Sequence, residues 1–346
     1  MHPINQDQNQ NLHIPSPQNS NKLGDLFTKQ GANYYLNPNS KLLLFSIDPS
    51  LSTLVRSSLN TLNASFFEQG LIADGGDLSN NTLEENCNQV FDLAFNQNKT
   101  IVLFGSDADF LFNLQQKLNA QFQPHRISCI SDNCDPLNSF DLESIYLKEL
   151  NMIGFQRQFS CPEESSIHYI RTGEFRANQS SIEPSLRRSE MVYFNLNAIR
   201  ASDSPGNSSK NPSGFFAEEA STIARIAGMS DRLKIFVISS WNENKDPEKI
   251  TSALVSQMVW YFWEGCHLKQ LDQNTNRASM TQYLVEIKNL DYILKFYKSE
   301  NSGKWWFEEP LIENEFSNQL IPCTYDEYLA TAKDQIPSRI LEMING

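Results

Sequence analysis

Short apolar runs alternate along this chain with longer segments in which apolar side chains recur at helical spacing. Seven runs are too short for helices and predict buried strands: residues 42–47, 71–76, 100–104, 126–130, 152–155, 191–194 and 233–239. Six longer segments predict helices: residues 51–62, 82–95, 110–118, 142–150, 215–227 and 246–264. The alternation predicts an α/β fold in three layers, α/β/α, with a mainly parallel central sheet.

Local punctuation predicts where the last of these helices begins and ends. Asp246 is of the type that caps a helix N-terminus, and Pro247 suits the first helical position. Gly265 follows the apolar stripe, as a glycine at a helix C-terminus does. The sequence therefore predicts a helix that starts at Asp246 and stops at Gly265.

The chain divides into a polar tail and a globular part. Residues 1–22 are rich in Asn, Gln, Ser and Pro, so burial cannot offset the entropy of ordering them, and we expect disorder. The composition becomes globular from Leu23 onward, without an internal repeat or a second linker. We therefore expect a single domain over residues 23–346.

Charge and hydropathy narrow the classes of partner and compartment. A net charge of −13 and a pI near 4.9 argue against nucleic acid or an anionic membrane as the main partner. No apolar run approaches the roughly 20 residues of a membrane span. The N-terminus lacks the basic and apolar regions of a signal peptide.

The six cysteines form no CxxC pair, which predicts reduced, mostly buried thiols in a cytoplasmic protein.

Two asparagines mark a candidate ligand site. Asn195 and Asn197 follow the strand predicted at 191–194, and their spacing places both side chains on one face of an extended segment. Ligands of open α/β sheets bind outside the carboxyl ends of the strands. The two amides are candidate ligand-binding groups there, but side chains that bond their own loop are the competing interpretation.

Several segments around this strand resemble one family. They are Glu183–Arg187, Met191–Gly214, Glu218–Ala220, Ala224–Ser230, Gln257–Phe262, Phe296–Ser299 and Trp305–Pro310. Together they resemble the arginase superfamily of ureohydrolases, and most of all the formimidoylglutamase-type branch found in Bacteroidetes-type bacteria. The resemblance implies an arginase-like fold and self-association into a homo-oligomer.

In that family six side chains hold two Mn²⁺ ions, and a glutamate binds the substrate. The resemblance maps these seven positions onto Asp107, Ser131, Asn133, Asp135, Asn195, Asn197 and Ser240. Of the six ligands, Asp135 alone is retained, because Asp107 stands at a histidine position. Asparagine keeps the shape of aspartate without its charge, and Mn²⁺ prefers anionic oxygen. Two carboxylates, Asp107 and Asp135, do not suffice for two adjacent cations.

Three hypotheses follow. The leading one is a non-catalytic arginase-fold protein with no metal cofactor, retained for binding or assembly with an unidentified protein partner. The second is a residual hydrolase of linear amidines with one Mn²⁺ held at Asp107 and Asp135. The third is a metal-free sensor whose pocket, formed by Asn133, Asn195 and Asn197, binds a small polar molecule.

Overall fold

The computed structural model describes most of the globular part of the chain. The described residues are 22–28, 33–65, 67, 71–78, 82–106, 108–161, 167–273, 280–287, 292–300, 302–309 and 320–345. Residues 1–21 of the predicted polar tail lie outside these ranges, and so does Asp107.

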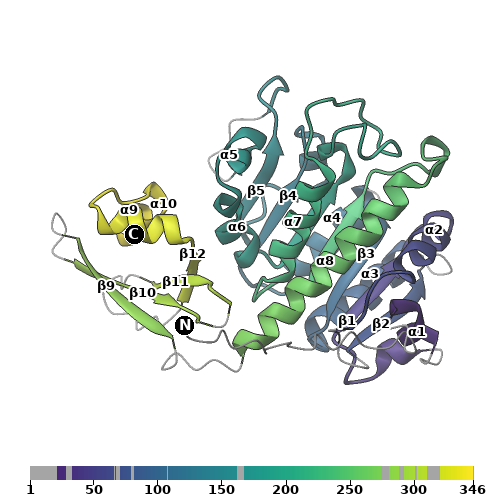
Figure 1. Ribbon diagram of the computed structural model, residues 1–346, viewed down its shortest axis with the longest axis horizontal. Helices are drawn as coiled ribbons and strands as arrows, with labels where there is room; N and C mark the ends of the chain where they lie inside the picture. Colours follow the sequence, from purple (N-terminus) through teal and green to yellow (C-terminus); the bar gives the residue numbers. More distant parts are fainter. Residues whose placement is uncertain are drawn as a thin grey trace, which may run out of the picture.

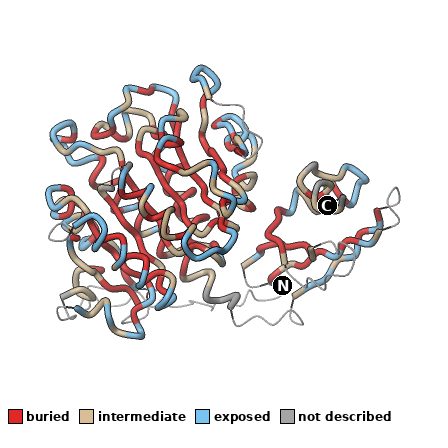
Figure 2. The backbone as a smooth tube through the Cα atoms, turned by 180° about the vertical axis from the view of Figure 1, so that it is seen from behind, coloured by how far each residue is buried: buried red, intermediate tan, exposed pale blue. Residues whose placement is uncertain are grey.

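Eight strands form one sheet in which every neighbouring pair is parallel, in the order β2-β1-β3-β8-β7-β4-β5-β6. The strands are β1 (Leu42–Ser46), β2 (Ile72–Asp77), β3 (Thr100–Ser106), β4 (His125–Ile130), β5 (Leu147–Phe155), β6 (Ile167–Arg171), β7 (Met191–Asn195) and β8 (Ile235–Ser239). All seven predicted runs fall on these strands. Figure 2 shows the central strands buried along their length.

Helices cover both faces of the sheet, as predicted (Figure 1). The helices that pack on one face are α1 (Leu23–Thr28), α2 (Pro49–Leu59), α5 (Thr172–Ala177), α6 (Glu183–Arg188), α7 (Ala217–Gly228) and α8 (Ile250–Gln273). Those on the other face are α3 (Leu83–Phe91), the π-helical turn η2 (Asp92–Asn96) and α4 (Ala108–Asn119). Each face has its own apolar core, so the three-layer α/β/α fold is confirmed.

Short 3-10 turns complete the loops of this part of the chain. They are η1 (Tyr34–Leu36), η3 (Asp135–Ser139), η4 (Gln179–Ile182), η5 (Leu196–Ala198) and η6 (Glu243–Lys245). Three of them, η3, η5 and η6, follow the carboxyl ends of strands β4, β7 and β8.

The helix predicted at 142–150 is wrong. Residues 142–146 form turns, and Leu147 begins β5, which pairs with β4 on one side and β6 on the other. The segment contains good helix formers, such as Leu147 and Glu149. It forms a strand because it pairs with β4 and β6, and such tertiary pairing overrides a local helix propensity.

The long helix α8 departs from its predicted ends for two different reasons. It begins at Ile250, so Pro247 is not its first residue. Asp246 still caps it from a distance, since its carboxylate accepts the N–H groups of Thr251 and Ser252 at 3.0 Å each. The helix runs through Gly265 to Gln273, because this glycine serves helix packing instead of helix termination.

A second sheet, not predicted from the sequence, follows α8. It is antiparallel, with β9 (Thr281–Ile287), β10 (Tyr292–Lys298), β11 (Trp305–Glu308) and β12 (Leu320–Cys323), and carries α9 (Tyr325–Ala332) and α10 (Ser338–Asn345). It has its own apolar core and lies beside the main sheet, near α6 (Figure 1).

A buried arginine joins the second sheet to helix α6. Arg187 of α6 is fully buried and lies 4.5 Å from the ring centroid of Trp306. Its Nη1 donates to the Trp305 carbonyl at 3.2 Å and to Glu183 Oε1 at 2.7 Å.

In the described part of the chain, no helix combines the length and apolarity needed to cross a membrane.

Candidate functional site

Four neighbouring strands of the main sheet, β3, β8, β7 and β4, end at one edge. Because they are parallel, their carboxyl ends bring together loops that are far apart in the sequence. A cavity of about 480 Å³ opens there, lined by residues at the ends of β3, β7 and β8 and in the segments that follow β1, β4, β7 and β8. The sheet therefore places a pocket where the sequence predicted a ligand site.

The predicted site residues are distributed unevenly around this pocket. Asp135, Asn195, Asn197 and Ser240 line it. Ser131 is fully buried below the surface, and Asn133 is bonded to Asp135 without lining the pocket itself. Asp107 lies outside the described residues.

The oxygens of Asn195 and Asn197 are directed at their own loop. Asn195 Oδ1 accepts the N–H of Asn197 at 2.9 Å and caps the turn η5. Asn197 Oδ1 accepts two backbone N–H groups, from Ser208 at 2.9 Å and from Ser209 at 3.0 Å. An amide oxygen has two acceptor sites, so the Asn197 oxygen is saturated and its –NH₂ group is what it can offer to a ligand.

Asn133 and Asp135 form a similar closed unit after β4. Asn133 Oδ1 accepts the N–H of Asp135, and its Nδ2 donates to Asp135 Oδ2, both at 3.0 Å. Asp135 is exposed at the start of η3. The amide thus holds the one carboxylate that the resemblance counted as a retained metal ligand.

Asp48 is a second carboxylate of the pocket, which the sequence analysis did not single out. It follows β1 and caps α2, where its Oδ1 accepts Ser50 N–H at 2.9 Å and Ser50 Oγ–H at 2.7 Å. Gly105 lies against it with φ of 83°, and a Cβ there would stand 2.9 Å from Asp48 Cβ. The signal was available, because Asp48-Pro49 directly after a strand is a helix-start signature.

Hydroxyl groups and an indole form the wall after β8. Ser239 Oγ donates to the Tyr193 hydroxyl at 2.6 Å. Burial raises the pKa of the Tyr193 phenol, and bonds with Ser239 and Ser240 offset part of the rise, so the phenol stays neutral near pH 7. Ser240 adopts a φ of 69°, which side chains other than glycine seldom adopt. Trp241 Nε1 is buried without a hydrogen-bond partner in the described part of the chain.

A further carboxylate lies buried behind the pocket. Asp132 is fully buried, and its Oδ2 accepts from Asn211 Nδ2 at 2.9 Å and Ser209 Oγ at 3.4 Å. Burial raises the pKa of this carboxyl, and the two donors offset part of the rise. It joins the loop after β4 to the loop that Asn197 holds. Its position between Ser131 and Asn133 gave no sign of this structural role.

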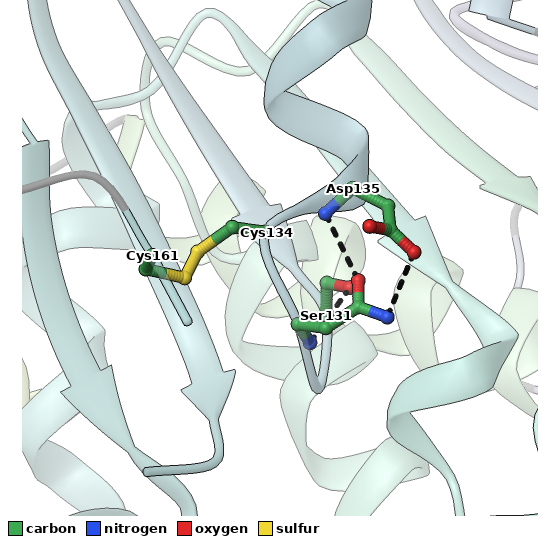
Figure 3. Close-up of a disulfide and its surroundings, with 5 residues drawn as sticks. Ser131, Cys134, Asp135 and Cys161 are labelled. Atoms are coloured by element: carbon green, nitrogen blue, oxygen red, sulfur yellow. Dashed lines mark hydrogen bonds between the residues drawn. A yellow bond between two sulfur atoms is a disulfide. The ribbon is translucent and has the colours of Figure 1, made fainter. Parts of the chain in front are cut away.

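A disulfide stands beside the site and corrects the expectation for the cysteines. Cys134 and Cys161 are bonded, with Cα atoms 5.5 Å apart, directly next to Asp135 (Figure 3). The expectation of six reduced thiols is wrong for this pair. It agrees with the four others, since Cys87, Cys129, Cys266 and Cys323 are buried free cysteines. A gap of 27 residues between the partners offers no local pattern to detect.

Removing this disulfide is expected to destabilise the protein. The bond closes a chain segment of 27 residues, and closing a loop of that length stabilises a fold by about 3 kcal/mol. We expect the double variant Cys134→Ser/Cys161→Ser to lose about that much unfolding free energy in urea titrations without reductant. With reductant present, variant and wild type should unfold together. Equal stability without reductant would contradict a formed disulfide.

Comparisons with known proteins identify the fold. No protein-family model and no curated protein matches the sequence. Among solved structures, formiminoglutamase of Trypanosoma cruzi with Mn²⁺ matches with a TM-score of 0.60 at 16% identity, over 72% of this chain and 99% of that one. This is an arginase-like fold.

Two other structures agree with this assignment. Formimidoylglutamase of Bacillus subtilis matches with a TM-score of 0.60 at 13% identity, over 75% of this chain and 96% of that one. Agmatine ureohydrolase of Thermoplasma volcanium matches with a TM-score of 0.56 at 15% identity, over 70% of this chain and 96% of that one. The arginase-like fold accounts for nearly all of each of these proteins but leaves more than a fifth of the present chain without a counterpart.

The described donors of this pocket, which do not include Asp107, do not fit a pair of manganese ions. In the described residues, no group of three or more His, Cys, Asp and Glu side chains comes close enough to hold a metal ion. The carboxylates on the described lining are Asp48, committed to a helix cap, and Asp135, bonded to Asn133. Two cations a few ångströms apart need more anionic oxygen than these supply.

Proposed function

We propose that this chain is a non-catalytic arginase-fold protein whose carboxyl-edge pocket binds a small polar molecule without metal. One observation carries the proposal: Asn197 spends both acceptor sites of its oxygen on the backbone of residues 208 and 209. A side chain used in this way cannot also coordinate a cation. The position that would hold metal in a ureohydrolase holds a loop instead.

The chemistry of the pocket indicates the class of ligand. The amides of Asn195 and Asn197 retain –NH₂ donors, which suit carbonyl or carboxylate oxygens. Asp48 and Asp135 supply negative charge, and no Lys, Arg or His is among the described residues that line the cavity. An amidinium or ammonium group is a suitable partner for these two carboxylates. We therefore propose a small molecule that carries both an acceptor oxygen and a cationic nitrogen group.

The similarity to formiminoglutamase, formimidoylglutamase and agmatine ureohydrolase supports the choice of probes. Formiminoglutamate, arginine and agmatine all carry an amidine or guanidine group, and the first two also carry carboxylates. The proposal is that formiminoglutamate or arginine binds and is not hydrolysed, and agmatine, which has no acceptor oxygen, tests whether the cationic group alone suffices. It also includes self-association or a protein partner in the cytoplasm.

Calorimetry and a turnover assay on the purified chain test the proposal together. We expect at least one of the three compounds to bind without Mn²⁺, and no release of urea or formamide with or without it. Asp135→Asn should weaken binding about tenfold, since one charge-assisted hydrogen bond contributes roughly 1.5–3 kcal/mol. Asp109→Asn removes an exposed carboxylate of α4 and should leave binding unchanged.

Two outcomes would contradict the proposal in different ways. Stoichiometric Mn²⁺ with turnover that is lost in Asp135→Asn would establish the residual hydrolase instead. Absence of binding by all three compounds, with the fold intact, would overturn the ligand class and leave protein assembly as the function to test.

A further inference from the structure

A second, smaller cavity lies at the amino edge of the main sheet, where the second sheet meets it. Its volume is about 50 Å³. Three arginines from separate segments line it: Arg126 at the start of β4, Arg188 at the end of α6 and Arg232 ahead of β8. The opposite wall is apolar and comes from β12 and α10 of the second sheet, with Ile321, Pro322 and Met343 among its residues. This cavity belongs to neither sheet alone.

Two carboxylates beside the cavity, Glu149 and Glu190, are shared among these arginines. Glu149 is shared, at 3.5 Å from Arg126 Nε and 3.3 Å from Arg188 Nη1. Glu190 pairs with Arg232 at 3.3 Å, and its other oxygen accepts the backbone N–H of Arg126 at 2.7 Å. Glu149 and Glu190 therefore each contact two of the three arginines, and Glu309 is a third carboxylate nearby.

The arginines also repel one another. Burial is the main cause that lowers the pKa of Arg188 to about 10; Glu149 opposes this shift, and the charges of Arg126, Arg339 and Arg232 add to it. Arg126 Nε is buried and makes no hydrogen bond within the described part of the chain. The lining of this small space thus carries three guanidinium groups and the carboxylate of Glu309, and one arginine there has a buried N–H that makes no hydrogen bond.

The dimensions and walls of the cavity select the ligand. One water occupies about 10–15 Å³ on this measure, so the cavity has room for roughly four waters or one tetrahedral oxyanion. Guanidinium groups bind phosphate oxygens in pairs of parallel hydrogen bonds. The apolar wall excludes water and strengthens these interactions.

Glu309 distinguishes among oxyanions. It lines the same cavity, and a carboxylate there repels an anion that has only acceptor oxygens. A hydrogen phosphate ion carries an O–H group that can donate to such a carboxylate. Sulfate has no proton at neutral pH.

We propose that this cavity is a binding site for hydrogen phosphate, held by Arg126, Arg188 and Arg232 and selected by Glu309. The anion joins the amino edge of the main sheet to the second sheet. Its site lies at the edge opposite the carboxyl-edge pocket and does not depend on the function proposed for that pocket. The small volume fits a free phosphate ion better than the phosphate group of a larger metabolite.

Isothermal titration of the full chain with inorganic phosphate tests this site. At constant ionic strength we expect saturable binding of phosphate, at least tenfold weaker binding of sulfate, and no heat from chloride. Glycerol phosphate, the probe for a phosphate group on a larger molecule, should bind at least tenfold more weakly than phosphate. A melting temperature that rises with phosphate would follow from binding to the folded state alone.

Variants assign the binding to the cavity. Arg188→Gln should weaken phosphate binding at least tenfold, and Arg232→Gln, at a more exposed position, provides the same test if Arg188→Gln does not fold. Arg157→Gln, an exposed arginine outside this cavity, should bind as wild type does. Glu309→Gln should reduce the preference for phosphate over sulfate.

Each failure is informative. Absence of saturable phosphate binding by the folded wild type would overturn the site. Unchanged affinity in folded Arg188→Gln and Arg232→Gln would place the binding elsewhere and overturn it equally. Equal affinity for phosphate and sulfate would overturn the role of Glu309, and tighter binding of glycerol phosphate would overturn the assignment to the free ion.

Discussion

Gly265→Ala is expected to lower the free energy of unfolding by about 3 kcal/mol, at the upper end of what overpacking costs. Helices α7 and α8 cross where Gly228 faces Gly265. A Cβ on Gly265 would stand 2.1 Å from the carbonyl oxygen of Arg225. That neighbour is backbone of another helix, so a rotamer change cannot relieve the clash and the helices must separate.

Gly173→Ala is the matched control for this change. Gly173 also lies in a helix, α5, but a Cβ there meets nothing within 4 Å. Alanine favours helix over glycine by about 0.5–1 kcal/mol, so we expect equal or slightly higher stability. Urea titrations followed by circular dichroism measure both. Similar stability of the two variants would show that α7 and α8 do not approach as closely as described.

Glu183→Ala is expected to cost about 3 kcal/mol, because it leaves the charge of Arg187 buried without its nearest carboxylate. Arg187 has no exposed side-chain surface, and its bond to Glu183 is 2.7 Å long. Removing one partner of a buried pair typically costs 3–5 kcal/mol. Asp231, at 3.8 Å, is a more distant and more exposed carboxylate that compensates in part.

The control is an ion pair of equal length in a different environment. Glu264 lies 2.7 Å from Arg225, whose side chain is 40% exposed. Glu264→Ala should cost 1 kcal/mol or less, since exposed pairs contribute about that much. Tryptophan fluorescence adds a local readout, because Arg187 packs on Trp306. Equal losses in the two variants would remove burial as the reason for the difference.

The main sheet was readable because its strands are short and apolar on both faces. β1, β7 and β8 are buried at every residue, which produces continuous apolar runs that no amphipathic helix has. The start of β5 was misread as helical, because Leu147 and Leu150 are separated by two charged residues, which is a helical spacing. The second sheet was missed for a different reason: β9 and β10 have exposed and charged residues between their buried ones, so they contain no continuous apolar run.

The candidate site was predicted as a place but not as a set of interactions. Strand ends follow from the apolar runs, which located the carboxyl edge with Asn195 and Asn197, and the family resemblance added Asp135 and Ser240. The direction in which an asparagine oxygen points could not be predicted from the sequence. Asn197 is saturated by Ser208 and Ser209, residues that a loop closure brings to it.

The sequence by itself determined the layered α/β architecture and the position of the pocket, because strand burial and chain alternation are properties of neighbouring residues. Only the tertiary structure decided the contacts between distant segments. It made Gly265 a packing residue instead of a helix end, bonded Cys134 to Cys161, and gathered Arg126, Arg188 and Arg232 around one cavity. These depend on which surfaces meet after folding, and no local pattern of side chains encodes that.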